Sequence, residues 1–246
     1  MTLPGDDYLI LSCEHGGNRL PPAFRRFFSR TFLNTHRGWD PGALELARDI
    51  AAATRAPLYF STISRLLVEL NRPLGHPQVL SLSLPDKTRE ALLRRYYLPY
   101  WDAVEAEVAK GLKQGRRVLH LSVHSFTPRF RGVKRAVDVG LLFDPRRAPE
   151  ARLCRRWEKA LSALSPRLRV RSNDPYRGTG PSLVQSLREI LPATRYVGIQ
   201  IEVSQRFPRG DAARWRALRR ILVAGFRLGV LGAAYGNRTR RSSLGS

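Results

Sequence analysis

Short apolar segments of strand length alternate with longer segments of helical spacing along almost the whole chain. This alternation restricts the possible folds more than any other feature. The strand-like segments lie at residues 8–13, 57–62, 65–70, 118–123, 137–143, 168–171 and 196–203. The helical segments lie at residues 22–33, 41–53, 86–112, 148–164, 182–190 and 211–231. Strands separated by helices favour a mostly parallel sheet covered on both faces. We therefore predict a protein of the α/β class.

The boundaries of these segments carry local signals, but none of them divides the chain into two domains. Asp40 before Pro41 is a good N-cap, Asp86 is another, and Pro99 predicts a bend in its helix. The sequence contains no internal repeat and no linker. We predict one domain, residues 1–236, followed by a basic and disordered tail, residues 237–246.

An excess of basic residues gives the chain a formal net charge of +23. Only five of its 43 basic residues are Lys, so 38 are Arg. Such a bias is typical of GC-rich genomes, but a positive surface also attracts polyanions and acidic small molecules. No nucleic-acid-binding motif interleaves aromatic residues with the basic pairs. Nucleic-acid binding is therefore not the expected primary role.

Several protein classes are excluded by what the sequence lacks. It has no run of about 18 apolar residues, and its first residues do not resemble a signal peptide. Its two cysteines, Cys13 and Cys154, suit a reducing compartment, so we predict a cytoplasmic location and no membrane partner. The sequence has no Walker A loop, no Gly-x-Gly-x-x-Gly after a strand and no Gly-x-Ser-x-Gly turn. These absences argue against nucleotide-dependent enzymes and serine hydrolases.

Polar residues follow several predicted strands, where the carboxyl ends of a parallel sheet form a site. His15 and His124 each follow an apolar strand and precede small residues. An imidazole in such a place either binds a metal or hydrogen-bonds a neighbouring carbonyl, and both interpretations are open at this point. His120 shares a strand face with His124 but lies about 13 Å away, too far for one metal.

Glu202 lies within an apolar strand, where a carboxylate is costly unless it is paired or faces a cleft. It is a candidate general base for a metal-activated water, and the alternative is a buried ion pair with an arginine. A further polar cluster contains Arg65, Asn71 and Arg72. The two arginines could hold a dicarboxylate and Asn71 could orient an amide, or all three could serve solubility and loop structure.

Several of these segments, taken in order, resemble the N-formylglutamate amidohydrolase family. They are Cys13-Glu-His-Gly-Gly-Asn18, His36-Arg-Gly-Trp-Asp40, Ser64-Arg65, Asn71-Arg72-Pro73, Val123-His124-Ser-Phe-Thr-Pro128, Asn173-Asp-Pro-Tyr-Arg-Gly178 and Ile201-Glu202. The first of these segments is similar to a divergent bacterial branch of the family. The better-studied members instead have a motif like Pro-His-Ser-Gly at that position.

The resemblance implies a phosphorylase/hydrolase-like fold, a three-layer α/β/α sandwich with a mixed, mostly parallel sheet. It also implies hydrolysis of the formyl amide of N-formylglutamate in amino-acid catabolism, with a divalent metal, expected to be zinc. His15 and His124 match the two histidine ligands and Glu202 matches the base. For the third ligand we predict Asp40, with Glu14 and Asn18 as the alternatives.

The partner implied by the resemblance is a small N-acyl amino acid. Arg65, Asn71 and Arg72 are the predicted substrate-binding residues, and the segment ending at Gly178 adds Asn173 and Tyr176. A rival function of another class is a catalytically inactive, basic α/β domain that binds RNA or another polyanion. Bound metal in stoichiometric amount distinguishes the enzyme from this rival.

Overall fold

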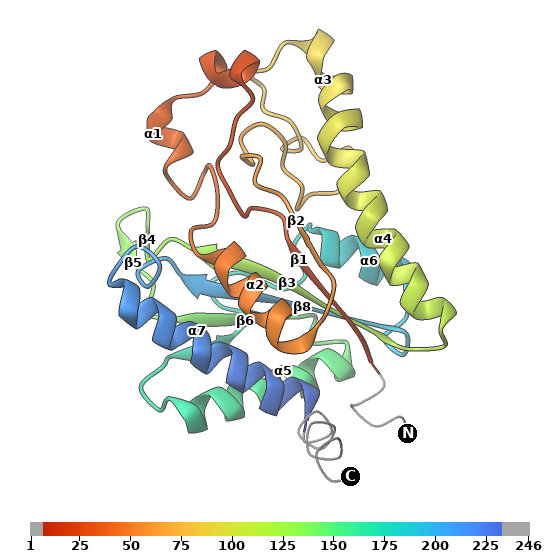
Figure 1. Cartoon of the computed structure of the whole chain (residues 1–246), viewed down its shortest axis with the longest axis vertical. Coiled ribbons are helices and arrows are strands. Elements are labelled where there is room, and N and C mark those ends of the chain that lie inside the picture. Colours follow the sequence, from red (N-terminus) through yellow and green to blue (C-terminus); the bar gives the residue numbers. More distant parts are fainter. Residues whose placement is uncertain (1–6, 233–246) are drawn as a thin grey trace, which may run out of the picture.

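A six-stranded sheet forms the middle layer of the protein (Figure 1). The structure is a computed structural model that describes residues 7–232, so the tail predicted at residues 237–246 lies outside the described residues. The strand order is β2-β1-β3-β8-β6-β7. The strands are β1 Tyr8–Cys13, β2 Leu58–Phe60, β3 Val118–Phe126, β6 Val139–Leu142, β7 Val170–Ser172 and β8 Tyr196–Ser204. All neighbouring strands are parallel except β6 and β8, which confirms a mixed, mostly parallel sheet.

Helices cover both faces of this sheet, which confirms the three-layer prediction (Figure 1). One face packs against α2 Ala43–Thr54, α5 Ala148–Leu164 and α7 Ala212–Phe226. The other face packs against α4 Leu98–Lys113 and α6 Leu183–Ile190. Alternate residues of a strand point to opposite faces, so Leu11 lies in the first core and Ile10 in the second. None of the helices within residues 7–232 combines the length and apolar character needed to cross a bilayer.

Two predicted elements differ from the structure. The helix predicted at residues 22–33 is divided into a 3-10 helix, η1 Pro22–Phe27, and a short helix, α1 Arg30–Leu33. Residues 65–70 were predicted as a strand, but they form a turn with a single bridge between Val68 and Leu80. Leu67, Val68 and Leu70 are all buried. When the apolar residues of a run are all buried, the sequence pattern is the same for a strand and for a packed turn.

Both predicted aspartate caps were wrong. Helix α2 begins at Ala43 after Gly42, whose φ of 80° suits glycine, and the side chain of Asp40 points instead at His124. Asp86 is the first residue of α3 Asp86–Leu92 rather than its cap. The segment runs through a π-helical turn, η2 Leu93–Tyr97, into α4, and this turn lies where Pro99 predicted a bend. Pro99 has no N–H to continue the regular helical pattern.

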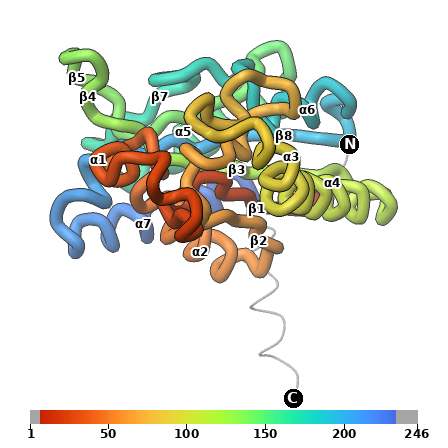
Figure 2. The backbone as a smooth tube through the Cα atoms, turned by 90° about the horizontal axis from the view of Figure 1, so that it is seen from above, coloured from red at the N-terminus to blue at the C-terminus, as the bar shows by residue number. Residues whose placement is uncertain are grey.

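The segments at residues 14–42 and 61–85 gather at the carboxyl ends of β1 and β2, at the top of Figure 1. Figure 2, which looks down on this end, shows the parts of the chain that carry α1 and α3 lying over β1 and β3. A small hairpin, β4 Arg129–Phe130 and β5 Val133–Lys134, follows β3 and was not predicted. Helix α7 ends in a second π-helical turn, η3 Arg227–Leu231. These loops and the ends of the strands enclose the site.

Candidate active site

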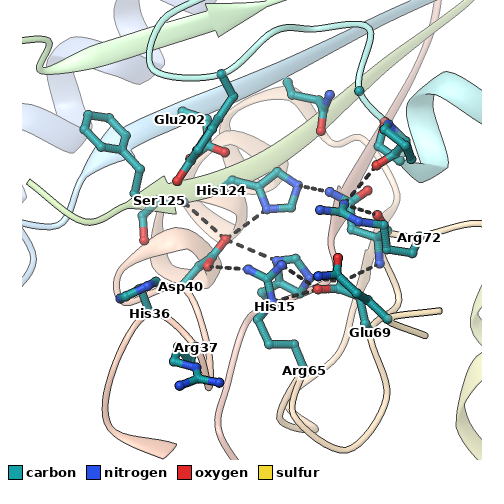
Figure 3. A pocket seen from close by; sticks show the side chains of 18 of the residues that line it. His15, His36, Arg37, Asp40, Arg65, Glu69, Arg72, His124, Ser125 and Glu202 are labelled. Carbon is teal, nitrogen blue, oxygen red and sulfur yellow. Dashed lines mark hydrogen bonds and ion pairs between the residues drawn. The ribbon is translucent and has the colours of Figure 1, made fainter. Parts of the chain in front are cut away.

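A cavity of about 870 Å³ opens at the carboxyl ends of β3 and β8. Its charged and imidazole-bearing lining residues are His15, His36, Arg37, Asp40, Arg65, Glu69, Arg72, His124, Arg177 and Glu202. They come from both loop segments above the sheet, from the strands and, for Arg177, from the connection between β7 and α6, and Figure 3 shows most of those it labels pointing toward a common centre. Segments distant in sequence therefore build one site.

The strands place a row of polar side chains on one face of the sheet. In β3 the residues His120, Ser122 and His124 alternate with apolar residues that enter the core under α2 and α5. His124 is the register partner of Glu202 on β8. Alternation of period two therefore keeps these polar groups on one face of the sheet, and His124 and Glu202 reach the cavity near the ends of their strands.

Two histidines and a carboxylate converge in the floor of this cavity. Oδ2 of Asp40 lies 2.9 Å from His124 Nδ1 and 3.3 Å from His15 Nδ1 (Figure 3). One ligand atom from each of the three side chains lies within 4.8 Å of the other two, and all three residues are buried. Two imidazole nitrogens with one carboxylate oxygen are a donor set that suits zinc. The predicted meeting of His15, Asp40 and His124 is therefore present in the structure.

The outer nitrogens of the two imidazoles also have polar partners. His15 Nε2 lies 2.5 Å from Glu69 Oε1. His124 Nε2 lies 2.8 Å from Ser122 Oγ, 3.1 Å from Glu14 Oε2 and 3.2 Å from Asn71 Nδ2. Each ring is thus held from both sides, and its Nδ1 edge faces Asp40.

The three candidates for the third ligand lie in different places. Only Asp40 faces both histidines. Glu14 lies behind His124, where Ser122 donates a hydrogen bond to it. The amide of Asn18 turns away from the site and donates to Leu33 O.

Charges in the floor of the cavity shift several ionisation equilibria. Burial alone would raise the pKa of Asp40, but His15 and His124 outweigh it and hold this pKa below its ordinary value. Burial likewise opposes ionisation of Glu14, yet the hydrogen bond from His124 lowers its pKa to about 2. For His124, burial alone would lower the pKa, but Asp40 and Glu14 outweigh burial and raise it. The two carboxylates that flank His124, Asp40 and Glu14, therefore favour the protonated form of its ring.

Glu202 differs from the other buried carboxylates of the site. Its Oε2 has no hydrogen-bond partner, and no ion pair with an arginine neutralises it among the described residues. Burial raises its pKa to about 7, and nearby Asp40 contributes to the rise. A group that takes up and releases a proton near neutral pH, beside two histidines and on a cavity, is suited to general base catalysis.

The predicted substrate-binding arginines both line the cavity, and both have partners within the protein. Arg65 donates from Nε to Glu69 Oε2 at 2.7 Å, and its Nη1 lies 3.7 Å from Asp40 Oδ1. Arg72 donates from Nη1 to the backbone oxygens of Asn71 and Pro181. Asn71 itself accepts from the backbone N–H of Leu183. The protein therefore fixes the orientation of all three side chains.

Asn173 and Tyr176 are separated by the structure. Tyr176 lines the cavity and accepts a hydrogen bond of 3.0 Å from Arg135. Asn173 is not part of the lining; its side-chain oxygen accepts from the N–H groups of Phe143 and Gly178 at 3.0 and 3.1 Å. Its placement does not suit substrate contact, because this oxygen is already used to hold the turn that carries Tyr176.

Two other polar residues are engaged elsewhere. His120 is fully buried between Tyr196 and Ser12, outside the cavity, as its distance along the strand predicted. The hydroxyl of Ser125 donates to Pro41 O and accepts from Gln205, so it is not presented as a nucleophile.

Glu69 lines the cavity but was not among the predicted site residues. It carried the same signal as Glu202, a carboxylate inside an apolar run. The prediction of a strand at residues 65–70 gave no reason to place Glu69 beside His15. Only the turn at these residues brings its carboxylate into the floor of the cavity.

Comparison with known proteins places this architecture in a family. A family model described as N-formylglutamate amidohydrolase matches residues 8–207. The crystal structure of gene product Atu2144 from Agrobacterium tumefaciens is similar with a TM-score of 0.76 and 26% identity, over 96% of this chain and 93% of that one. The crystal structure of N-formylglutamate amidohydrolase from Ralstonia eutropha JMP134 is similar with a TM-score of 0.66 and 21% identity, over 98% and 97%. No curated protein matched the chain.

The family model covers both loop segments of the cavity and the strands that carry His124 and Glu202. The match therefore includes the site as well as the sheet. The chain belongs to the N-formylglutamate amidohydrolase family, a family of hydrolases that act on amide bonds.

Proposed function

We propose that this protein is a metal-dependent amidohydrolase that removes the N-acyl group, formyl or similar, from an acidic amino acid of the N-formylglutamate type. The observation that carries the proposal is the convergence of His15, Asp40 and His124 beside the unpaired carboxyl of Glu202. The family and the size of the cavity support a small-molecule amide as the substrate.

The residues present fit a divalent metal, and zinc is the proposed ion. His15, Asp40 and His124 would hold it, since they are buried and their ligand atoms already lie within 4.8 Å of one another. When bound, such an ion supplies Lewis-acid chemistry, the activation of water and of an amide carbonyl.

Glu202 is the proposed base. Its side chain reaches the cavity from β8, next to His124, and its pKa of about 7 lets it accept a proton at neutral pH. The same carboxyl then donates this proton to the nitrogen of the leaving amino acid, which must be protonated to depart as an amine.

The arginines of the cavity are the proposed partners of the acidic substrate. Arg65 and Arg72 line the cavity together with Asn71, and each guanidinium has more N–H groups than its internal hydrogen bonds use. A planar guanidinium can hold a carboxylate through two parallel hydrogen bonds. Tyr176, which accepts a hydrogen bond from Arg135, is proposed to contact the same substrate.

The test combines metal analysis with a substrate screen. Purified protein is analysed for bound zinc, and hydrolysis is measured on N-formyl and N-acetyl derivatives of glutamate, aspartate, glutamine and leucine. The proposal expects about one metal per chain and turnover of the acidic substrates. Protein without metal and without hydrolysis, but with affinity for RNA, would instead support the rival function of a basic polyanion-binding domain.

A further inference from the structure

Glu69 is a buried carboxylate at the edge of the proposed metal site, and the chemistry above gives it no role. It lies in the turn at residues 65–70 and its side chain is only 6% exposed. A carboxylate removed from water in this way is costly unless its oxygens are paired. Its partners therefore indicate what it does.

Both oxygens of Glu69 are occupied by donors from this chain. Oε1 lies 2.5 Å from His15 Nε2 and accepts a hydrogen bond of 2.9 Å from the backbone N–H of Asn71. Oε2 accepts from Arg65 Nε at 2.7 Å, and the Arg65 Nη2 group forms an ion pair with the same oxygen. Glu69 is therefore arranged to orient a neighbour rather than to replace Asp40 as a ligand.

The chemistry of the pair determines where the proton of the imidazole lies. An ionised carboxylate only accepts hydrogen bonds, so the proton between Glu69 and His15 must come from Nε2 of the ring. In a neutral imidazole the free lone pair then lies on Nδ1. That nitrogen faces Asp40 Oδ2 at 3.3 Å, toward His124.

We propose that Glu69 is a positioning residue that keeps the proton of His15 on Nε2, so that Nδ1 is the nitrogen presented to the metal. The inference concerns the proposed metal site, and it rests on the proposed function. Arg65 and the Asn71 N–H hold Glu69 in place, which gives Arg65 a task in addition to substrate binding. Carboxylates that accept from the second nitrogen of a ligand histidine typically change metal affinity by about 10- to 100-fold.

The test compares the full-length wild type with Glu69→Gln. Gln keeps the shape, but its amide can present either the oxygen or the NH₂ group to His15, so the ring is no longer restricted to one tautomer. Zinc affinity is measured by competition with a chelator, and the tautomer of His15 by long-range ¹H–¹⁵N NMR of the metal-free protein.

The matched control is Glu107→Gln. Glu107 also accepts hydrogen bonds from three neighbours, Tyr8, Tyr59 and Lys110, but it lies outside the cavity. We expect the Glu69 variant to bind zinc about 10- to 100-fold more weakly and to populate the Nδ1–H tautomer. The Glu107 variant should keep the zinc affinity of the wild type even where its stability falls.

Two results would overturn the inference. One is a Glu69→Gln variant with the zinc affinity of the wild type. The other is a wild-type protein whose His15 carries its proton on Nδ1, a measurement that does not require any variant to fold. A wild type that binds no zinc would refute the proposed function instead, and the tautomer of His15 would still decide whether Glu69 orients the ring.

Discussion

Replacing Glu202 by Gln should change catalysis and stability in opposite directions. The carboxyl is buried, its Oε2 has no hydrogen-bond partner, and burial raises its pKa to about 7. The folded protein therefore keeps a proton that the unfolded chain releases near the ordinary value of 4.5. Gln preserves the shape of the side chain but can neither lose nor accept this proton.

The size of the effect follows from the two pKa values. Because the folded state binds the proton more tightly, the contribution of Glu202 to stability declines as the pH rises from 4.5 to about 7. At 1.36 kcal/mol for each pH unit, this difference corresponds to ~3 kcal/mol. Most of this loss of stability develops between pH 4.5 and pH 7. Over that range Glu202→Gln should gain stability relative to the wild type, while its kcat falls by about 100-fold or more.

The assay is urea unfolding of the metal-free protein at several pH values, together with kcat on N-formylglutamate. Glu189→Gln, an exposed residue of α6, is the control for the loss of one charge. Curves of unfolding free energy against pH that run parallel for wild type and Glu202→Gln would refute the raised pKa. A kcat close to that of the wild type would refute the role in proton transfer.

Three further predictions follow from the same geometry. The pKa of His124 is raised, so a metal must displace its proton at any pH below that pKa. Zinc affinity should therefore increase about tenfold for each unit by which the pH increases toward that pKa, as a chelator titration at pH 6, 7 and 8 would measure. Arg72→Ala should lower kcat/KM for N-formylglutamate by at least about tenfold but hardly change it for N-formyl-leucine, and an equal loss on both substrates would argue against a carboxylate contact. Asn173→Ala should lower the free energy of unfolding by ~2 kcal/mol, since two backbone N–H groups lose their acceptor, whereas a raised KM at unchanged stability would indicate substrate contact instead.

The parts of the site that lie on strands or directly after them could be predicted from the sequence. Apolar alternation identifies β1, β3 and β8, and parallel strands bring their carboxyl ends to one edge of the sheet. His15, His124 and Glu202 were therefore expected near one another before any contact was known. Their spacing along each strand also kept His120 away from the site, as the structure confirms.

The sequence by itself determined the α/β class and the strands that end at the site, because period-two and helical patterns are local and can be recognised in the sequence alone. Only the tertiary structure decided how the loops complete that site. Asp40 has the sequence context of a helix cap and Glu69 that of a strand residue, yet both turn their carboxylates to His15. The sequence also did not indicate which two strands pair in the antiparallel direction, and the structure shows that they are β6 and β8. Contacts of this kind join residues up to 54 positions apart around one imidazole, and they depend on packing of the loops that no local pattern encodes.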